Sequence, residues 1–247
     1  MNQGRRLLSS SGLFLLIMVL CFSGALSAKE KGVFKGIDRF SGDTDGKKMF
    51  MEGSNLEYFQ GETYIRFVQA EIVEQADGSR EVTFMGNVSL QHEDLYVTGD
   101  KFCYNTDKKS GIFSGEVVLK REETLNDQGE VEKEGIKLVC NSLLLHTEEK
   151  TFIAREKPFI EHKDFQGSGE EIRYLDAEEL LTIVGDLQIQ KGKEEIKGEE
   201  ICFNLKHKTF EAKRGAEPLE MIFEIEEKEE KSSREEEESI SDPETSS

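Results

Sequence analysis

The chain has 247 residues, and 51 acidic against 32 basic residues give a formal net charge of −19 at pH 7. A charge of this sign disfavours nucleic-acid binding and simple electrostatic adsorption to anionic membranes, because both need a basic surface. Tryptophan is absent and tyrosine is sparse, so a sugar-stacking lectin surface is less supported.

Residues 1–28 have the pattern of a signal peptide. Arg5 and Arg6 supply the positive start, residues 13–22 are apolar, and residues 25–28 are small enough for cleavage. The apolar run is shorter than the roughly 20 residues that span a bilayer. We therefore predict secretion with cleavage, and the alternative is an uncleaved N-terminal anchor.

The rest of the chain divides by composition into three parts. Residues 29–48 are rich in Gly, Asp and Lys and are expected to form an irregular lead-in. Residues 49–225 carry alternating segments between turn signals and are expected to form the folded body. Residues 226–247 contain almost nothing apolar beyond Ile240, so an acidic disordered tail is predicted.

The clearest strand pattern lies in residues 82–104. Apolar and polar residues alternate over residues 82–90, as in a strand with one buried and one solvated face. Residues 91–94 are predicted to form the turn of a hairpin, after which the alternation resumes. The apolar parity then changes between Val97 and Phe102, which predicts a β-bulge near residues 99–101.

This unit repeats along the chain. Gly86 and Gly99 recur as Gly185 and Gly198 with the same separation of 13 positions. The period is about 30 residues, lengthened to about 40 by a polar insert at residues 122–134, and such self-similarity indicates stacked supersecondary units with one shared core. No segment shows a convincing helical period. We therefore predict an all-β chain.

The search for catalytic and metal-binding residues gives no positive result. Cys103, Cys140 and Cys202 lack metal-ligand spacing and are interpreted as small apolar fillers, without a disulfide. His92 and His162 each lie near acidic residues, but we interpret both as parts of solvated turns. No nucleophile elbow or nucleotide fingerprint is present. We expect no enzymatic activity, no metal and no cofactor.

A repeated β stack with one apolar face makes an elongated trough that suits acyl chains, since each buried methylene contributes roughly 0.8 kcal/mol. The alternative is that the same face closes on itself as a dry core, which would make the protein a structural or assembly scaffold. Composition does not separate the two. Our candidates for acyl contact are the inward residues of the clearest hairpins: Val82, Phe84, Val88, Leu90, Phe102, Tyr104, Phe113, Val117, Leu119, Ile183, Leu187 and Ile189.

Five short segments resemble the signature of the OstA-like family, which includes the periplasmic bridge protein of lipopolysaccharide export. They are residues 86–88, 99–104, 156–158, 169–174 and 184–187, and the likeness extends over roughly residues 49–223. The resemblance implies an elongated, repeated antiparallel β-jellyroll with an open or slit-like apolar interior that holds the acyl chains of lipopolysaccharide.

The same resemblance implies a location and partners. It places the protein in the periplasm, where it would assemble edge to edge with its own copies and with related jellyrolls of the inner- and outer-membrane export machinery. An inner-membrane anchor is the alternative location. Three features depart from a minimal bridge protein, namely the extra repeat with its insert, the strong acidity and the Glu-rich tail. The cargo could therefore be a related lipid.

Overall fold

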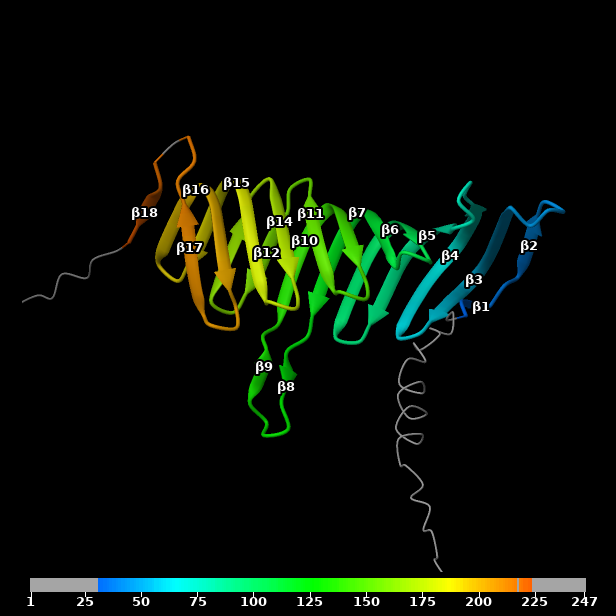
Figure 1. Cartoon of the computed structure of the whole chain (residues 1–247), viewed down its shortest axis with the longest axis horizontal. Helices are drawn as coiled ribbons and strands as arrows, with labels where there is room; N and C mark the ends of the chain where they lie inside the picture. The colour runs from blue at the N-terminus through cyan, green and yellow to red at the C-terminus, as the bar shows by residue number, and fades with distance from the viewer. Residues whose placement is uncertain (1–30, 217, 224–247) are drawn as a thin grey trace, which may run out of the picture.

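The computed structural model describes residues 31–216 and 218–223. The predicted signal peptide and acidic tail lie outside these residues. The described part is built of antiparallel strands and turns, stacked along one long axis as an elongated roll (Figure 1). This confirms the predicted all-β jellyroll. No helix in this part has the length and apolar character needed to cross a membrane.

Sixteen strands belong to one sheet, and β8 and β9 form a separate two-stranded sheet. In chain order the strands are β1 (Val33–Lys35), β2 (Arg39–Gly42), β3 (Lys48–Gln60), β4 (Thr63–Glu74), β5 (Arg80–His92), β6 (Leu95–Asn105), β7 (Ser110–Arg121), β8 (Thr124–Leu125), β9 (Val131–Lys133), β10 (Ile136–His146), β11 (Thr151–Arg155), β12 (Phe159–His162), β13 (Phe165–Ser168), β14 (Glu171–Leu175), β15 (Leu180–Lys191), β16 (Glu194–Asn204), β17 (Thr209–Lys213) and β18 (Glu220–Ile222).

The long strands fold over at a common corner, so their halves lie in two layers. The corner is marked by shifts of register, such as that between Met85 and Val88 in β5. The ladder pairings join one half of each long strand into a first layer, which we call layer one. Layer one contains residues 56–60, 63–66, 88–92, 95–99, 117–121, 136–140, 159–168 and 187–198. Layer two contains residues 48–52, 69–74, 80–85, 101–105, 110–114, 142–146, 151–155, 171–175, 180–184 and 200–213.

The repeated glycines lie at this corner. Gly86 and Gly185 have φ angles of +85° and +76°, and the residues that follow, Asn87 and Asp186, are also left-handed. Glycine adopts this conformation at little cost, and Asn and Asp tolerate it better than other residues. The backbone can therefore turn from one layer into the other at the same point of each repeat.

The bulge predicted near residues 99–101 is confirmed. The register of β6 against β7 shifts between Thr98 and Lys101. Asp100 and Lys101 are both exposed, whereas Gly99 and Phe102 on either side are buried. The two adjacent exposed residues account for the change of apolar parity in the sequence.

Some strands break at the corner instead of bending. β11 in layer two continues as β12 in layer one after Pro158, and both halves pair with β10. β17 and β18 have the same relation to β16 on either side of Pro218. Proline has no backbone N–H to offer to a ladder, so the two prolines mark the places where the ladder is interrupted.

The apolar faces of both layers meet in one continuous core. Phe84 and Ile183, which belong to different repeats, are both fully buried in it. The ring centroids of Tyr58 in layer one and Phe84 in layer two are 5.5 Å apart. Near the other end of the roll, Phe165 of layer one stacks on Phe203 of layer two at 3.9 Å. The core therefore runs along the roll between the layers.

Two expectations need correction. The lead-in at residues 29–48 is not wholly irregular, because β1 and β2 pair with β3. β5 extends to His92, so the predicted turn at residues 91–94 contains only residues 93–94. His92 is not solvated as expected, because it is 9% exposed and its Nδ1 lies 3.0 Å from Thr63 Oγ1. The polar insert forms the β8–β9 hairpin, which projects from the body (Figure 1).

Candidate functional site

The predicted groove residues all lie in the interior between the layers. Each of the twelve has an exposed fraction of 2% or less, and all belong to the continuous core. Side chains of the two layers fill this interior, so it is closed in the structure. Contact of these residues with acyl chains stays a prediction.

The free edges of the two layers are rows of turns, which we call lips. Lip one consists of residues 61–62, 93–94, 122–135, 163–164 and 192–193. Lip two consists of residues 75–79, 106–109, 147–150, 176–179 and 205–208. The lips face each other along a line that we call the slit. Side-chain contacts across the slit hold the interior closed.

Two side chains, Gln60 and Lys150, close the slit in its N-terminal half. Gln60, at the end of β3, donates from Nε2 to the carbonyl oxygen of Thr106 at 3.3 Å. Lys150 of lip two lies 2.5 Å from Glu93 Oε2 and 3.1 Å from Asp94 Oδ1 of lip one. Burial alone would lower the pKa of Lys150, but the hydrogen bonds to the two carboxylates raise it above its ordinary value. The ammonium therefore stays charged at neutral pH.

Arg121 closes the middle of the slit. Its guanidinium, 3% exposed, donates to the Tyr174 hydroxyl and lies 3.4 Å from Asp176 Oδ1. It also donates to the backbone oxygen of Glu134 at 2.7 Å. Lys133 of β9 adds a second cation 2.6 Å from Asp176 Oδ2. Burial lowers the pKa of Arg121 against the opposing effect of Asp176, but a guanidinium keeps its charge in proteins.

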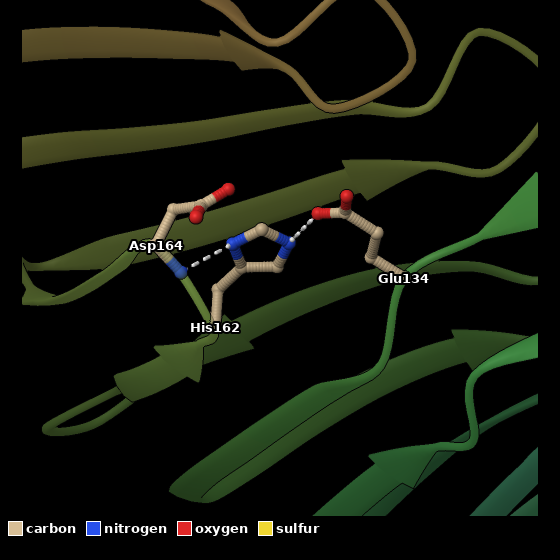
Figure 2. A group of neighbouring side chains, drawn as sticks. All are labelled: Glu134, His162 and Asp164. Carbon is tan, nitrogen blue, oxygen red and sulfur yellow. Dashed lines mark hydrogen bonds and ion pairs between the residues drawn. The ribbon is translucent and has the colours of Figure 1, made fainter. Parts of the chain in front are cut away.

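Glu134 makes the polar contacts at the C-terminal end of the slit, and Figure 2 shows it beside His162. Its carboxylate, 8% exposed, lies 2.8 Å from His162 Nε2 and 2.5 Å from Lys163 Nζ, both in lip one or at its edge. It reaches lip two through Lys208 Nζ at 3.3 Å. Burial would raise the pKa of Glu134, but the hydrogen bonds from Lys163 and Lys208 hold it below its usual range. Glu134 is therefore ionised.

The partners of His162 fix its tautomer. The backbone N–H of Asp164 donates to Nδ1 at 3.3 Å, so Nε2 carries the proton and faces Glu134 (Figure 2). Burial lowers the pKa of His162, which favours the neutral ring. The interpretation of His162 as part of a solvated turn is thus wrong, because its side chain is only 2% exposed.

Glu134, His162 and Asp164 also have the donor types of a metal site, with one ligand atom of each within 4.8 Å of the others. Their surroundings do not fit an ion. Lys163 and Lys208 already balance the charge of Glu134. A metal on Nε2 would displace its proton while Nδ1 still faces an N–H donor, whereas metal-bound histidines normally donate from the second nitrogen. The cluster is therefore interpreted as an ion-pair network around Glu134.

Cavities adjoin the slit at both ends. One of about 390 Å³ at the N-terminal end is lined by residues that include Tyr58, Ile72 and Val82. One of about 260 Å³ at the C-terminal end is lined by residues that include Phe165 and Phe203. Core side chains therefore line a cavity at each end of the closed interior.

Sequence reasoning did not find the lip contacts. Arg121 and Tyr174 are 53 positions apart, and Lys150 and Glu93 are 57 apart. Nothing in one sequence couples residues at such separations, since most exposed charges are simply solvated. The only available signal was that Arg121 immediately precedes the polar insert and Glu134 ends it.

A family model for "LptA/(LptD N-terminal domain) LPS transport protein" matches residues 67–209. This segment is more than half of the chain and contains most of both layers. The chain belongs to this family. Membership confirms the resemblance to the OstA-like group at the level of the family and places the protein among lipopolysaccharide transport proteins.

Among solved structures, one match is the crystal structure of LptH from Pseudomonas aeruginosa, described as the LptA-homologous periplasmic component of the conserved lipopolysaccharide transport device. The identity is 10% and the TM-score is 0.24, over 79% of this chain and 96% of that chain. No curated protein matches the sequence.

Proposed function

We propose that this protein is a periplasmic lipid-binding module that shields the acyl chains of lipopolysaccharide, or of a related lipid, during transfer from the inner to the outer membrane. The observation that carries the proposal is the single apolar core between two layers whose lips meet through side-chain contacts. These contacts can part without breaking a strand ladder, which would turn the core into an apolar trough along the roll.

Three further features support this proposal. The family is one of lipopolysaccharide transport proteins. The pattern of residues 1–28 favours export. The cavities at both ends bring core residues to the surface. Retention of the N-terminal segment as an inner-membrane anchor is the alternative for localisation.

The protein would work with partners of the same architecture. β1 and β2 end the sheet at one side, and β17 and β18 end it at the other. Strands at the edge of a sheet are templates for pairing with another sheet. We propose that copies of this chain, or jellyrolls of the two membrane-bound parts of the machinery, extend the roll at these edges.

Photocrosslinking in cells tests the proposal. A benzophenone amino acid at Leu187, which is 1% exposed, should form adducts with lipid, and the same group at the exposed Asn87 should not. Phe84 gives a second interior position in another repeat. Adducts at position 87 without adducts at the two interior positions would reject the interior as the lipid site.

The closed core favours a second candidate, a scaffold with a dry interior. The twelve candidate residues are covered by protein atoms without any ligand, as a permanently closed core requires. Native mass spectrometry of the purified chain separates the two functions. Lipid that accompanies the folded protein supports transport. Complete absence of lipid, together with tolerance of polar substitutions at the lips, supports the scaffold.

A further inference from the structure

The C-terminal cavity lies where the apolar core comes to the slit. Its floor includes Phe165 of layer one and Phe203 of layer two, which stack on each other and are 6% and 5% exposed. Leu205 of lip two adds a third member of the core, and Phe210, 39% exposed, lies at the outer side. An apolar chain that entered here would contact both layers at once.

The slit is closed less firmly above this cavity than in its middle. The ion pair across it is that of Lys208 and Glu134 at 3.3 Å, and the side chain of Lys208 is 66% exposed. In the middle of the slit, Arg121 and Asp176 are 3% and 12% exposed, and the space beneath them is about 10 Å³. Ion pairs with an exposed partner contribute roughly 0–1 kcal/mol. The layers can therefore part more easily at Lys208 than at Arg121.

The rim of the cavity is balanced in charge, in a strongly acidic protein. Lys191 and Lys208 line it, against the carboxylates of Glu134 and Asp164, and Lys163 pairs with Glu134 from outside the cavity. Glu134 is already neutralised by Lys163 and Lys208. Lys191 lies at the end of β15, where its ammonium stands over the ring of Phe210, and it forms no ion pair with a carboxylate of the described residues. It is therefore placed to meet a negative group on a ligand.

The N-terminal cavity has a net negative lining. Glu74 and Asp107 line it together with Arg80, and Arg80 lies 4.0 Å from Glu74. The side chain of Gln60 also lines this space and is bound to Thr106. An anionic amphiphile therefore finds a less favourable field at this end.

Together these observations point to a binding site, and we propose that the C-terminal cavity is the entry point of the interior for an acyl chain that carries an anionic head. The chain inserts between Phe165 and Phe203 as Lys208 and Glu134 separate, and the head is held by Lys191. This inference rests on the proposed function, to which it adds a place of entry and the charge of the ligand head.

Photocrosslinking of the purified full chain with cis-parinaric acid, a fluorescent fatty acid, tests the site. The benzophenone amino acid is placed at Phe210, at Thr106 beside the N-terminal cavity, and at the exposed Ile112 as a control. Adducts are expected at position 210 before they appear at interior position 187. Adducts at position 106 but not at 210 would overturn the proposed entry point.

A charge variant gives a second measurement that does not depend on crosslinking. Lys191→Glu should weaken binding of cis-parinaric acid about tenfold, because a charge-assisted contact with the head becomes a repulsion. Binding of the neutral methyl ester should change less than twofold. Lys101→Glu, on the outer face of β6, is the matched control and should leave both affinities unchanged. Equal affinities of the Lys191→Glu and Lys101→Glu variants for the acid would contradict the role of Lys191.

The two proposals fail in different ways. Adducts at interior positions 84 and 187 without any at position 210, and no effect of Lys191→Glu, would remove the entry point and leave the transport function standing. Absence of adducts at every position, with no binding of either probe, would remove both.

Discussion

Lys150 and Asp94 lie on opposite lips of the jellyroll, with Lys150 Nζ 3.1 Å from Asp94 Oδ1 and the two side chains 18% and 12% exposed. They come from turns 56 positions apart in the sequence. A pair that is largely shielded from water is stronger than one on the open surface, and the loss of one partner leaves the other poorly solvated. The stability of the closed state should therefore depend on Lys150 more than on most lysines.

Lys150→Met should lower the free energy of unfolding by about 1–3 kcal/mol, since it leaves Asp94 and Glu93 without their charged donor. Urea unfolding measures this loss. Lys137→Met is the control, because Lys137 pairs with Glu161 within one layer and both side chains are nearly half exposed. Its cost should stay below about 1 kcal/mol. If the two variants cost the same, Lys150 has no special part in closing the slit.

The corner glycines predict a graded series of alanine substitutions. An added Cβ at Gly86 would lie 2.9 Å from Val68 Cβ, which belongs to a stiff side chain. At Gly185 it would meet the carboxyl end of Glu170, which can move, and at Gly78 it meets nothing within 4 Å. All three have positive φ, which alone costs alanine about 1 kcal/mol. We expect Gly86→Ala to lose about 2–4 kcal/mol, Gly185→Ala less, and Gly78→Ala about 1 kcal/mol.

Thermal unfolding of the three variants checks this order. Gly78→Ala serves as the control for the backbone term, because its surroundings are open. An equal loss at Gly78 and Gly86 would show that φ alone decides the cost and that close packing between β4 and β5 adds nothing.

The sequence predicted the repeating part of the fold because residues that are close together in the sequence determine the strands and the corner. Alternation over residues 82–90 identifies one buried face, and Gly86 with Asn87 shows where the strand turns into the second layer. Gly185 and Asp186 repeat the same pattern. Such features depend on neighbours within a few positions, so one sequence is enough to reveal them.

The contacts that close the slit have no comparable pattern in the local sequence. His162 was interpreted as solvated because its sequence neighbours are polar, whereas the carboxylate that buries it, that of Glu134, arrives from the base of the β8–β9 hairpin. The lead-in was predicted as irregular because β1 and β2 have only three and four residues and gain their order by pairing with β3. Both errors concern partners that are distant in the chain.

The three described cysteines are free and should differ in reactivity. Cys103 and Cys202 are partly exposed, at equivalent positions 3.6 Å from the hydroxyls of Thr83 and Thr182. Cys140 is buried, and burial raises the pKa of its thiol to about 11. Because the thiolate is the reactive form, Cys103 and Cys202 should react with a maleimide at pH 8 and Cys140 should react only after denaturation. Peptide mass spectrometry identifies the labelled sites.

Similar labelling of all three thiols in the folded chain would contradict the closed interior. Cys103→Ser with Cys202→Ser provides the control, since Cys140 of this variant should remain unlabelled until urea is added. A variant with Lys150→Met in the same background then reports whether the loss of a lip contact exposes Cys140.

Buried histidines make the stability of the closed state depend on pH. Burial holds the pKa of His162 below its ordinary 6.5, so the unfolded chain takes up a proton at a higher pH than the folded chain. Stability should therefore fall as the pH drops below about 6.5, by at most about 1.4 kcal/mol per pH unit for this one group. The pKa of His92 is lowered by burial as well, so this residue adds to the loss of stability in the same pH range.

The lowered pKa of Glu134 acts in a different pH range. Its contribution to the free energy of unfolding is present above about pH 4.5 and is lost in more acidic solution.

Urea unfolding between pH 7.5 and 5 measures this dependence. His162→Gln keeps a donor toward Glu134 but does not titrate, so its stability should fall less steeply with acidification than that of the wild-type chain. His207→Gln is the matched control, because His207 is exposed in the β16–β17 turn and its loss should leave the slope unchanged. A wild-type slope that persists in His162→Gln would place the titration elsewhere. His92→Gln would then show whether the hydrogen bond between His92 and Thr63 accounts for it.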